Sequence, residues 1–282
     1  MTIEVVPSGC RLGADVRGVD LRKPLAAGDA DAVRAAWYEH LVLRFRGPPL
    51  GDEELIAFSR TFGALDRSAL SEVGRYADVL PEITVVSNIV VDGKPIGSLG
   101  AGEALWHTDS SCEPAPPDGS VLHALEIPPQ GGNTQFCNMY DAYDRLPASI
   151  KDAIHGRKAV HDNAYTAAGG LRVGKTPVAD VRRTQGAHHP LVRTHPITGR
   201  KALYLGRRRN SYIVGMEVEA SERLLDELWS YAVDPAGVWT QVWEVGDVVL
   251  WDNRAVMHRR DEFDPDSRRL LHRTQITGSV PY

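Results

Sequence analysis

The segment "GDVVLWDNRAVMHRRDEFDPDSRRLLHRTQITG", residues 246–278, indicates most clearly which fold this chain adopts. It contains two short stretches, 247–252 and 270–277, that are rich in Val, Leu, Ile and Thr and are bounded by Gly, Asp or Asn. Runs of this length and composition are typical of β-strands. A polar connection separates them, and His258 follows the first. The segment therefore predicts two strands with a histidine close to one of them.

The rest of the chain repeats this pattern of short segments. Its 26 glycines and 18 prolines are spread over the whole length, which favours short elements. Further strands are predicted at 83–88, 120–127, 189–195 and 201–206. Helical patterns cover 29–43, 52–62, 141–155 and 219–232, with Ser221 as the expected N-cap of the last one. We therefore expect a mainly β fold with peripheral helices around a sandwich or jelly-roll barrel.

The domain organisation follows from what the sequence lacks. No internal repeat and no low-complexity linker divides the 282 residues, so we expect a single domain over 1–282. Residues 162–188 are polar, contain glycines and show no helix or strand pattern. A segment of that length in a compact domain is often functional, and we expect an active-site lid there.

Composition restricts the possible partners and location. A formal charge of -5 provides no general attraction for nucleic acid or an anionic membrane surface, so a bound anion must be met by a local cluster. No run of 18 apolar residues predicts a membrane span, and the first residues do not resemble a signal peptide. Cys10, Cys112 and Cys137 lack metal-binding spacing. We expect reduced thiols and a cytoplasmic protein.

A second histidine region, "ALWHTDSSCEP" at 104–114, offers candidate metal ligands. If it is a strand, His107 and Asp109 lie on one face, although such a pair can also arise by chance. Together with His258 they form a two-histidine, one-carboxylate set that leaves three positions open on Fe(II). The alternatives are a zinc-dependent hydrolase or lyase on a cupin-like barrel, or a His258 that is simply solvated beside Arg259 and Arg260.

Two arginines, Arg269 and Arg273, follow His258 and are four residues apart. On a strand, Arg269 and Arg273 lie on one face about 13 Å apart, whereas Arg268 and His272 face the other way. Buried guanidinium groups require anionic partners. A dicarboxylate cosubstrate and a charged substrate would supply them; the alternative is pairing with the chain's own acids at Asp261, Glu262, Asp264 or Asp266.

At this point the sequence resembles a known family. The motifs are "LGADVRGVDL" at 12–21, "LWHTDSS" around His107, "GGNTQFCNMYDAYDRLP" at 131–147, "HPLVRTHPITGRKALYLG" at 189–206 and the segment around His258. They resemble, nearly end to end, the taurine dioxygenase and 2,4-dichlorophenoxyacetate dioxygenase family of Fe(II)- and 2-oxoglutarate-dependent oxygenases. The resemblance implies a double-stranded β-helix, which is a jelly-roll, cupin-like core.

The resemblance also implies roles for single residues. His107, Asp109 and His258 would hold iron. Arg273 would bind the far carboxylate of 2-oxoglutarate as a guanidinium fork, and the Thr134 hydroxyl would hydrogen-bond the same carboxylate. Arg269, also in the motif region, would meet the anionic group of the substrate. The implied cofactors are Fe(II), 2-oxoglutarate and O2, and the implied assembly is a homo-oligomer, either a dimer or a tetramer.

The implied reaction hydroxylates a substrate carbon, with or without subsequent bond cleavage, and releases succinate and CO2. The substrate itself depends on residues outside the motifs. Glu103 stands about where the taurine enzyme presents a neutral amide, and a carboxylate there would repel a sulfonate or attract an amine. Substrate identity is therefore expected to differ from taurine.

The run "LYLGRRRNSYIVGM", residues 203–216, carries further candidate substrate residues. At most one or two of Arg207, Arg208 and Arg209 can face a pocket; otherwise the run is a solvated basic loop. Tyr204 could form an apolar wall or belong to the core. With Arg269, these residues favour a small anionic substrate such as a carboxylate, aryloxyalkanoate, sulfonate or alkyl sulfate.

Overall fold

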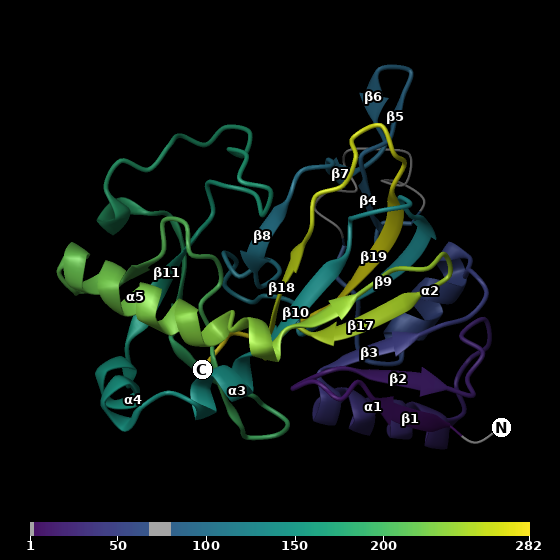
Figure 1. Cartoon of the computed structure of the whole chain (residues 1–282), viewed down its shortest axis with the longest axis horizontal. Helices are drawn as coiled ribbons and strands as arrows, with labels where there is room; N and C mark the ends of the chain where they lie inside the picture. Colours follow the sequence, from purple (N-terminus) through teal and green to yellow (C-terminus); the bar gives the residue numbers. More distant parts are fainter. Residues whose placement is uncertain (1–2, 68–79) are drawn as a thin grey trace.

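The computed structural model describes residues 3–67 and 80–282. Its largest element is an eight-stranded sheet in which most neighbouring strands are antiparallel (Figure 1). The strands lie in the order β1 (Glu4–Pro7), β2 (Ala14–Arg17), β3 (Val42–Phe45), β17 (Val248–Asp252), β9 (Gly119–Glu126), β19 (Leu270–Ile276), β4 (Thr84–Ser87) and β7 (Ser98–Leu99).

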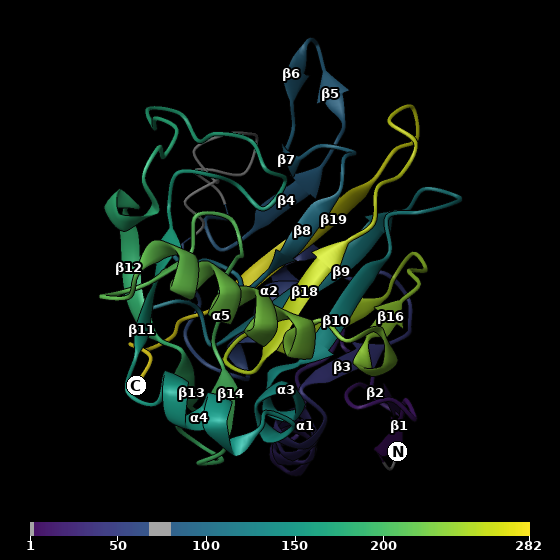
Figure 2. The ribbon, with the colours of Figure 1, turned by 60° about the vertical axis from the view of Figure 1, so that its left-hand side comes forward.

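A smaller, antiparallel sheet of four strands lies against the large one (Figure 2). Its order is β16 (Trp239–Gln241), β10 (Thr134–Asn138), β18 (Val256–Arg260) and β8 (Ala104–His107). The rings of Phe136 in β10 and Trp251 in β17 lie 5.7 Å apart between centroids, so side chains of the two sheets pack together. The register places His107 directly opposite His258.

Helices cover the outer surfaces. Helices α1 (Ala27–His40) and α2 (Asp52–Arg60) pack on the large sheet, where Trp37 and Leu55 join a buried apolar cluster. Helices α3 (Met139–Asp144), α4 (Ala148–Ile154) and α5 (Val218–Ala232) lie on the opposite side of the molecule (Figure 1). Their apolar faces join the cluster that fills the space around the small sheet. No helix in the described ranges has both the length and the apolar character needed to cross a bilayer.

Smaller elements complete the fold, and the β5–β6 pair among them projects beyond β7, away from α5 (Figure 1). A three-stranded sheet has the order β12 (Gly186–Pro190), β11 (Lys158–Asp162) and β15 (Tyr212–Ile213), and there are two strand pairs, β13 (Val192–Thr194) with β14 (Lys201–Leu203) and β5 (Val90–Val91) with β6 (Lys94–Pro95). The short 3-10 helices are η1 (Val181–Arg183) and η2 (Pro235–Gly237). Between β11 and η1, residues 163–180 form no regular helix or strand.

The mainly β fold with peripheral helices is confirmed, and so are the predicted helices at 52–62 and 219–232 with small shifts of their ends. Two helix predictions were wrong in part. The helix expected over 29–43 ends at His40, because Leu41 adopts a φ of 66° and the next residues form β3. The helix expected over 141–155 is interrupted at Pro147, which cannot donate a backbone hydrogen bond inside a helix.

Two local predictions also need correction. Ser221 is not the N-cap of α5; it lies inside the helix, and its hydroxyl accepts a hydrogen bond of 2.9 Å from the Ile213 amide. The strand expected at 189–195 is divided between β12 and β13 around Leu191. Sequence patterns did not reveal β10 because its residues "TQFCN" lack the apolar alternation that identifies a half-buried strand.

Candidate metal centre and active site

Three side chains converge where the small sheet meets the large one. His107 ends β8, Asp109 follows two residues later, and His258 lies in the middle of β18. One potential ligand atom from each lies within 4.8 Å of the others. Asp109 Oδ1 is 3.6 Å from His107 Nε2 and 3.8 Å from His258 Nε2. All three residues are buried, with exposed fractions of 8%, 4% and 8%.

Hydrogen bonds fix the orientation of these side chains. His107 Nδ1 lies 2.7 Å from the Leu105 carbonyl oxygen, which directs Nε2 toward the centre. Ser120 Oγ donates to Asp109 Oδ2 at 2.9 Å. The fully buried Asn253 side chain accepts from the Asp109 amide at 2.9 Å and donates to its carbonyl at 3.0 Å. Such outer contacts hold metal ligands in their binding geometry.

The protonation states suit a cation. Burial alone would raise the pKa of Asp109, but Arg273, His258 and His107 hold that pKa well below its ordinary range. Burial, together with His107, lowers the pKa of His258 to about 3. At neutral pH the site therefore presents an ionised carboxylate and a neutral His258 imidazole. Metal bonds of about 2.1 Å would place neighbouring ligand atoms about 3.0–3.4 Å apart, so a small contraction is enough.

Strand β19 carries the trailing arginine to the same place. Arg273 Nη1 donates to Asp109 Oδ1 at 3.1 Å. His272 points to the other face of the strand, where Nδ1 lies 2.6 Å from a carboxylate oxygen of Asp52 in α2. Arg268 likewise faces outward and pairs with Glu126. The predicted alternation along this strand is confirmed.

Arg269 lies deeper in the interior, with 2% of its surface exposed. Its Nη2 donates to the Gly132 carbonyl at 3.2 Å, and within residues 3–67 and 80–282 no carboxylate lies at ion-pair distance. The alternative of pairing with Asp261 is wrong, since Asp261 pairs with Arg259. Burial, with a smaller effect of Arg260, lowers the pKa of Arg269. A buried cation in this state favours an anionic ligand.

Thr134 lies next to this arginine. It begins β10 two residues after Gly132, whose α-carbon environment is bounded by the Arg269 side chain. The residue is buried, and its hydroxyl accepts a hydrogen bond of 3.1 Å from Trp243 Nε1. Because that bond uses the oxygen as acceptor, the hydroxyl hydrogen stays available to a carboxylate.

The three consecutive arginines point in different directions. Arg207 donates to the backbone carbonyls of Tyr165 and Asp162. Arg208 pairs with Glu222 and Asp226 of α5. Arg209 stacks on the Tyr165 ring, with its guanidinium carbon 3.6 Å from the ring centroid. As expected from their adjacency, only part of the run faces inward.

Two of the predicted substrate residues lie away from the metal cluster. Glu103 is exposed and pairs with Arg259 at 2.9 Å, on the opposite face of β18 from His258. Tyr204 is buried in a cluster, 5.4 Å from the His161 ring and 5.1 Å from the Arg193 guanidinium. Their predicted contact with substrate is therefore not supported, because strand alternation turns one outward and packing encloses the other.

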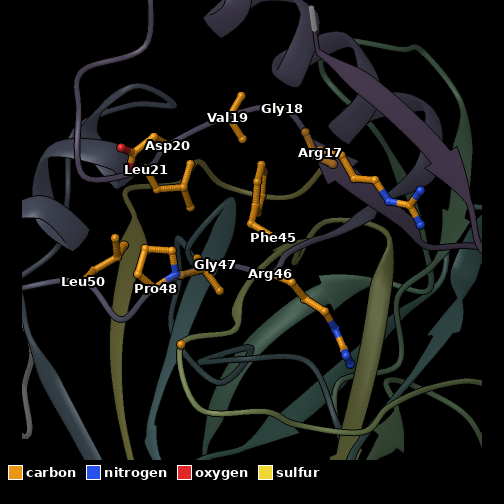
Figure 3. A pocket seen from close by; sticks show the side chains of 13 residues that line it. Arg17, Gly18, Val19, Asp20, Leu21, Phe45, Arg46, Gly47, Pro48 and Leu50 are labelled. Carbon is orange, nitrogen blue, oxygen red and sulfur yellow. The ribbon is translucent and has the colours of Figure 1, made fainter. Parts of the chain in front are cut away.

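Two cavities have contrasting positions. One of about 230 Å³ borders β8 and α5, and its lining combines the apolar side chains of Leu105, Trp106, Tyr165 and Trp229 with Asp162 and the arginines at 207–209. Another, of about 130 Å³, lies at the far end of the large sheet between β2 and β3 (Figure 3). Val19, Leu21 and Phe45 surround this second cavity, and no predicted site residue lines it.

Comparisons with known proteins agree with the site. Residues 4–275 match the model of the taurine catabolism dioxygenase TauD, TfdA family. The chain belongs to this family. It is 35% identical to the alpha-ketoglutarate-dependent 2,4-dichlorophenoxyacetate dioxygenase of Cupriavidus pinatubonensis over 97% of each chain. It is 30% identical to the alpha-ketoglutarate-dependent sulfate ester dioxygenase of Pseudomonas putida, over 100% of this chain and 91% of that protein.

A solved structure extends the likeness to three dimensions. The structure of AAD-2 in complex with Mn(II) and N-oxalylglycine superposes with a TM-score of 0.81 at 33% identity, covering 100% of this chain and 99% of the other. This member of the TauD, TfdA family is therefore a 2-oxoglutarate-dependent dioxygenase that uses Fe(II), 2-oxoglutarate and O2. Family membership decides against the zinc hydrolase or lyase alternative.

Sequence reasoning missed several residues of this TauD, TfdA family site. Ser120 and Gln275 face Asp109 from neighbouring strands of the large sheet, and Asn253 reaches it from the turn after β17. Each is far from Asp109 in sequence, so no local spacing identifies it. Only the motif "WDNR" hinted that Asn253 has a role, because a buried amide in a turn needs partners.

Proposed function

We propose that His107, Asp109 and His258 bind the iron of this dioxygenase. The observation that carries the proposal is their convergence as a buried two-histidine, one-carboxylate cluster. Three protein ligands leave three positions of Fe(II) for cosubstrate and oxygen. When bound, iron with 2-oxoglutarate and O2 supplies the oxidant that hydroxylates a substrate carbon, with release of succinate and CO2. The chain's own contribution is to orient these groups and exclude water.

We propose roles for the two arginines that differ from those implied by the resemblance. When its 2-oxo acid end binds the metal, 2-oxoglutarate would present its far carboxylate away from the three protein ligands. Arg273 hydrogen-bonds the candidate ligand Asp109 and is thus too near the metal for that carboxylate. Arg269, about 13 Å further along the strand, has no acid partner among the described residues. We assign it, with Thr134, to the far carboxylate.

Arg273 then acts at the end near the metal. Its guanidinium faces Asp109, and only one of its five N–H donors is used in that contact. The remaining donors suit the metal-proximal carboxylate of the cosubstrate. In this position Arg273 also holds the carboxylate of Asp109 in its ionised form, which a cation requires.

The substrate proposed here is a small anionic organic molecule such as a carboxylate, aryloxyalkanoate, sulfonate or alkyl sulfate. The names of the relatives support this class, since one acts on an aryloxyacetate and another on sulfate esters. Residues 162–188 are proposed as the lid, because 163–180 are irregular and border the cavity beside β8.

Four further expectations remain proposals. The two sheets are proposed to be the halves of a double-stranded β-helix, supported by the contact between Phe136 and Trp251. The whole of 1–282 is proposed to be one domain, and the protein a cytoplasmic homo-oligomer, either a dimer or a tetramer. The three cysteines, all free, fit a reducing compartment. Light scattering after gel filtration measures the oligomeric state.

One experiment tests the metal assignment. Purified metal-free protein is mixed anaerobically with Fe(II) and 2-oxoglutarate, and the visible charge-transfer band of the chelate is recorded. We expect a band that vanishes in the variant Asp109→Ala and persists in Glu103→Gln, the matched removal of a nearby carboxylate outside the cluster. The assignment would be wrong if the band also persisted in Asp109→Ala, or if zinc alone supported turnover.

A further inference from the structure

We propose that Arg172 and Arg207 form an anion subsite in the lid that receives the charged group of the organic substrate. The inference rests on the proposed function and identifies which side chains choose the substrate. Arg172 lies in the irregular segment between β11 and η1, and Arg207 follows β14. Segments far apart in sequence therefore bring two cations together around the Tyr165 carbonyl.

The two guanidinium groups converge on a single acceptor. Arg172 Nε donates to the Tyr165 carbonyl at 3.2 Å, and Arg207 Nη1 donates to the same oxygen. Arg207 Nη2 reaches the Asp162 carbonyl at 3.4 Å. One carbonyl oxygen and a long hydrogen bond leave most of the N–H donors of both groups to other acceptors.

No acid neutralises this pair in the described part of the chain. The nearby carboxylate of Asp162 accepts from the Ala164 amide and from Asn210 Nδ2 and is not at ion-pair distance from Arg207. Burial lowers the pKa of Arg207, with smaller contributions that include repulsion by Arg172. Arg172 is exposed to solvent, whereas Arg207 is partly buried and lines the cavity beside β8, so Arg207 is the cation that most needs an external anion and Arg172 adds charge at the solvent side.

Neighbouring arginines behave differently, which makes the absence of a partner informative. Arg208 pairs with two carboxylates of α5, and Arg182, also in the lid, pairs with Asp180 at 2.9 Å. Acids are thus available in this part of the chain, yet none is placed against Arg172 or Arg207.

The cavity beside Arg207 also restricts the shape of the ligand. Arg207 borders the cavity of about 230 Å³ whose lining includes Trp106, Trp229 and Leu105. The amide of Thr108, which lies between His107 and Asp109, donates to the Gly206 carbonyl at 3.1 Å, so the segment that carries Arg207 adjoins the metal centre. An anion bound here would place an apolar body along the tryptophans. The substrate class that fits is an amphipathic organic anion with an aromatic or alkyl body.

The test compares anions with neutral analogues of the same shape. Binding to the anaerobic Fe(II) and 2-oxoglutarate complex is followed by tryptophan fluorescence and by the shift of the charge-transfer band. The probe pairs are 4-chlorophenoxyacetate with its methyl ester and hexyl sulfate with hexanol. The variants are Arg172→Gln, Arg207→Gln and Arg207→Lys, and Arg182→Gln is the control that removes a lid charge already paired with Asp180.

We expect wild type and Arg182→Gln to prefer one of the anions over its neutral analogue. Arg172→Gln and Arg207→Gln should each weaken anion binding by roughly ten- to a hundredfold, with less than threefold change for the neutral probe. Arg207→Lys should retain part of the preference, because it keeps the charge without the fork.

Equal weakening of both probes would mean that Arg207 only fastens the lid, and the proposal would then be wrong. An absence of anion preference in wild type across both pairs would also contradict it. Failure of the proposed function looks different: the chelate band is then missing in wild type, whereas the fluorescence readout of the subsite is unaffected.

Discussion

The proposed metal centre and the proposed lid hold their polar groups in opposite ways. Around Asp109, carboxylate and backbone are contacted by Ser120, Arg273 and Asn253, and the strands that carry the two histidines are paired in register. In the lid, Arg172 and Arg207 rest on a backbone carbonyl in a segment without regular structure. The first arrangement fixes its side chains in one geometry, whereas the second leaves most of its N–H donors free for the ligand that we propose.

This difference indicates that strand residues determine the reaction, whereas loop residues determine the substrate specificity. Groups fixed by strands keep the metal and cosubstrate in one geometry, which the reaction requires whatever the substrate. Groups on a loop can change among relatives without disturbing those strands. The relatives named above share a cosubstrate but act on an aryloxyacetate and on sulfate esters, as this division leads one to expect.

Removal of a metal ligand should have the largest effect. His258→Ala leaves two ligands, so we expect Fe(II) affinity to fall more than about a hundredfold and succinate formation to cease. His155→Ala, an exposed histidine at the end of α4, serves as the control. Isothermal titration with Fe(II) or Mn(II) measures the affinity. Unchanged metal binding in His258→Ala would remove this residue from the site.

The next largest effect should come from the arginine of the far carboxylate. Arg269→Ala removes a buried fork, and we expect the KM for 2-oxoglutarate to rise about a hundredfold. Arg268→Ala, which breaks only an exposed pair with Glu126, should leave that KM within twofold. The measurement is succinate release against cosubstrate concentration. A larger rise in Arg273→Ala than in Arg269→Ala would restore the roles implied by the family resemblance.

A smaller effect is expected for the residue that holds the backbone of Asp109. Asn253→Ala deletes three hydrogen bonds, including one of 2.9 Å to the Pro117 carbonyl. Metal affinity should fall about ten- to a hundredfold. Asn253→Asp keeps the acceptor for the Asp109 amide and loses the donors, so its metal affinity should lie between those of wild type and Asn253→Ala. Thermal melting of the metal-free forms separates this positioning role from a general loss of folding.

The smallest effect on activity is expected for His123, which instead influences how the free energy of unfolding depends on pH. Burial, with a smaller effect of His272, lowers the pKa of His123 from 6.5 to about 4. Between these values the unfolded chain binds a proton that the folded chain does not, so stability falls as the pH decreases from about 6.5 to about 4. His123 alone contributes on the order of 3 kcal/mol to that fall.

Replacement of His123 by glutamine should reduce this pH dependence. His123→Gln keeps an acceptor for the Leu50 amide, which donates to His123 Nε2 at 3.1 Å. Urea unfolding of the metal-free protein at pH 7 and pH 4.5 measures the difference, and the variant should lose less stability between them. Identical losses in both proteins would show that other buried groups account for the acid sensitivity.

Much of the scaffold was predictable because it depends on local patterns. The strands at 247–252 and 270–277 and the alternation that separates Arg273 from His272 follow from a period of two, which the structure keeps. Pro147 was visible in the sequence, yet the helical pattern on both sides concealed the break. Asn253 and Ser120 could not be predicted, because their contacts with Asp109 span 144 and 11 positions and depend on tertiary packing.

Direct pairing of His107 with His258 has a consequence for the whole chain. A metal ion that joins these side chains ties together positions about 150 residues apart, and thereby closes a loop comparable to that of a long-range disulfide. Iron binding therefore also raises the free energy of unfolding of the protein. The loaded enzyme should resist proteolysis and heat more strongly as the free metal concentration rises, with a stabilisation that grows with the logarithm of that concentration once it exceeds the dissociation constant.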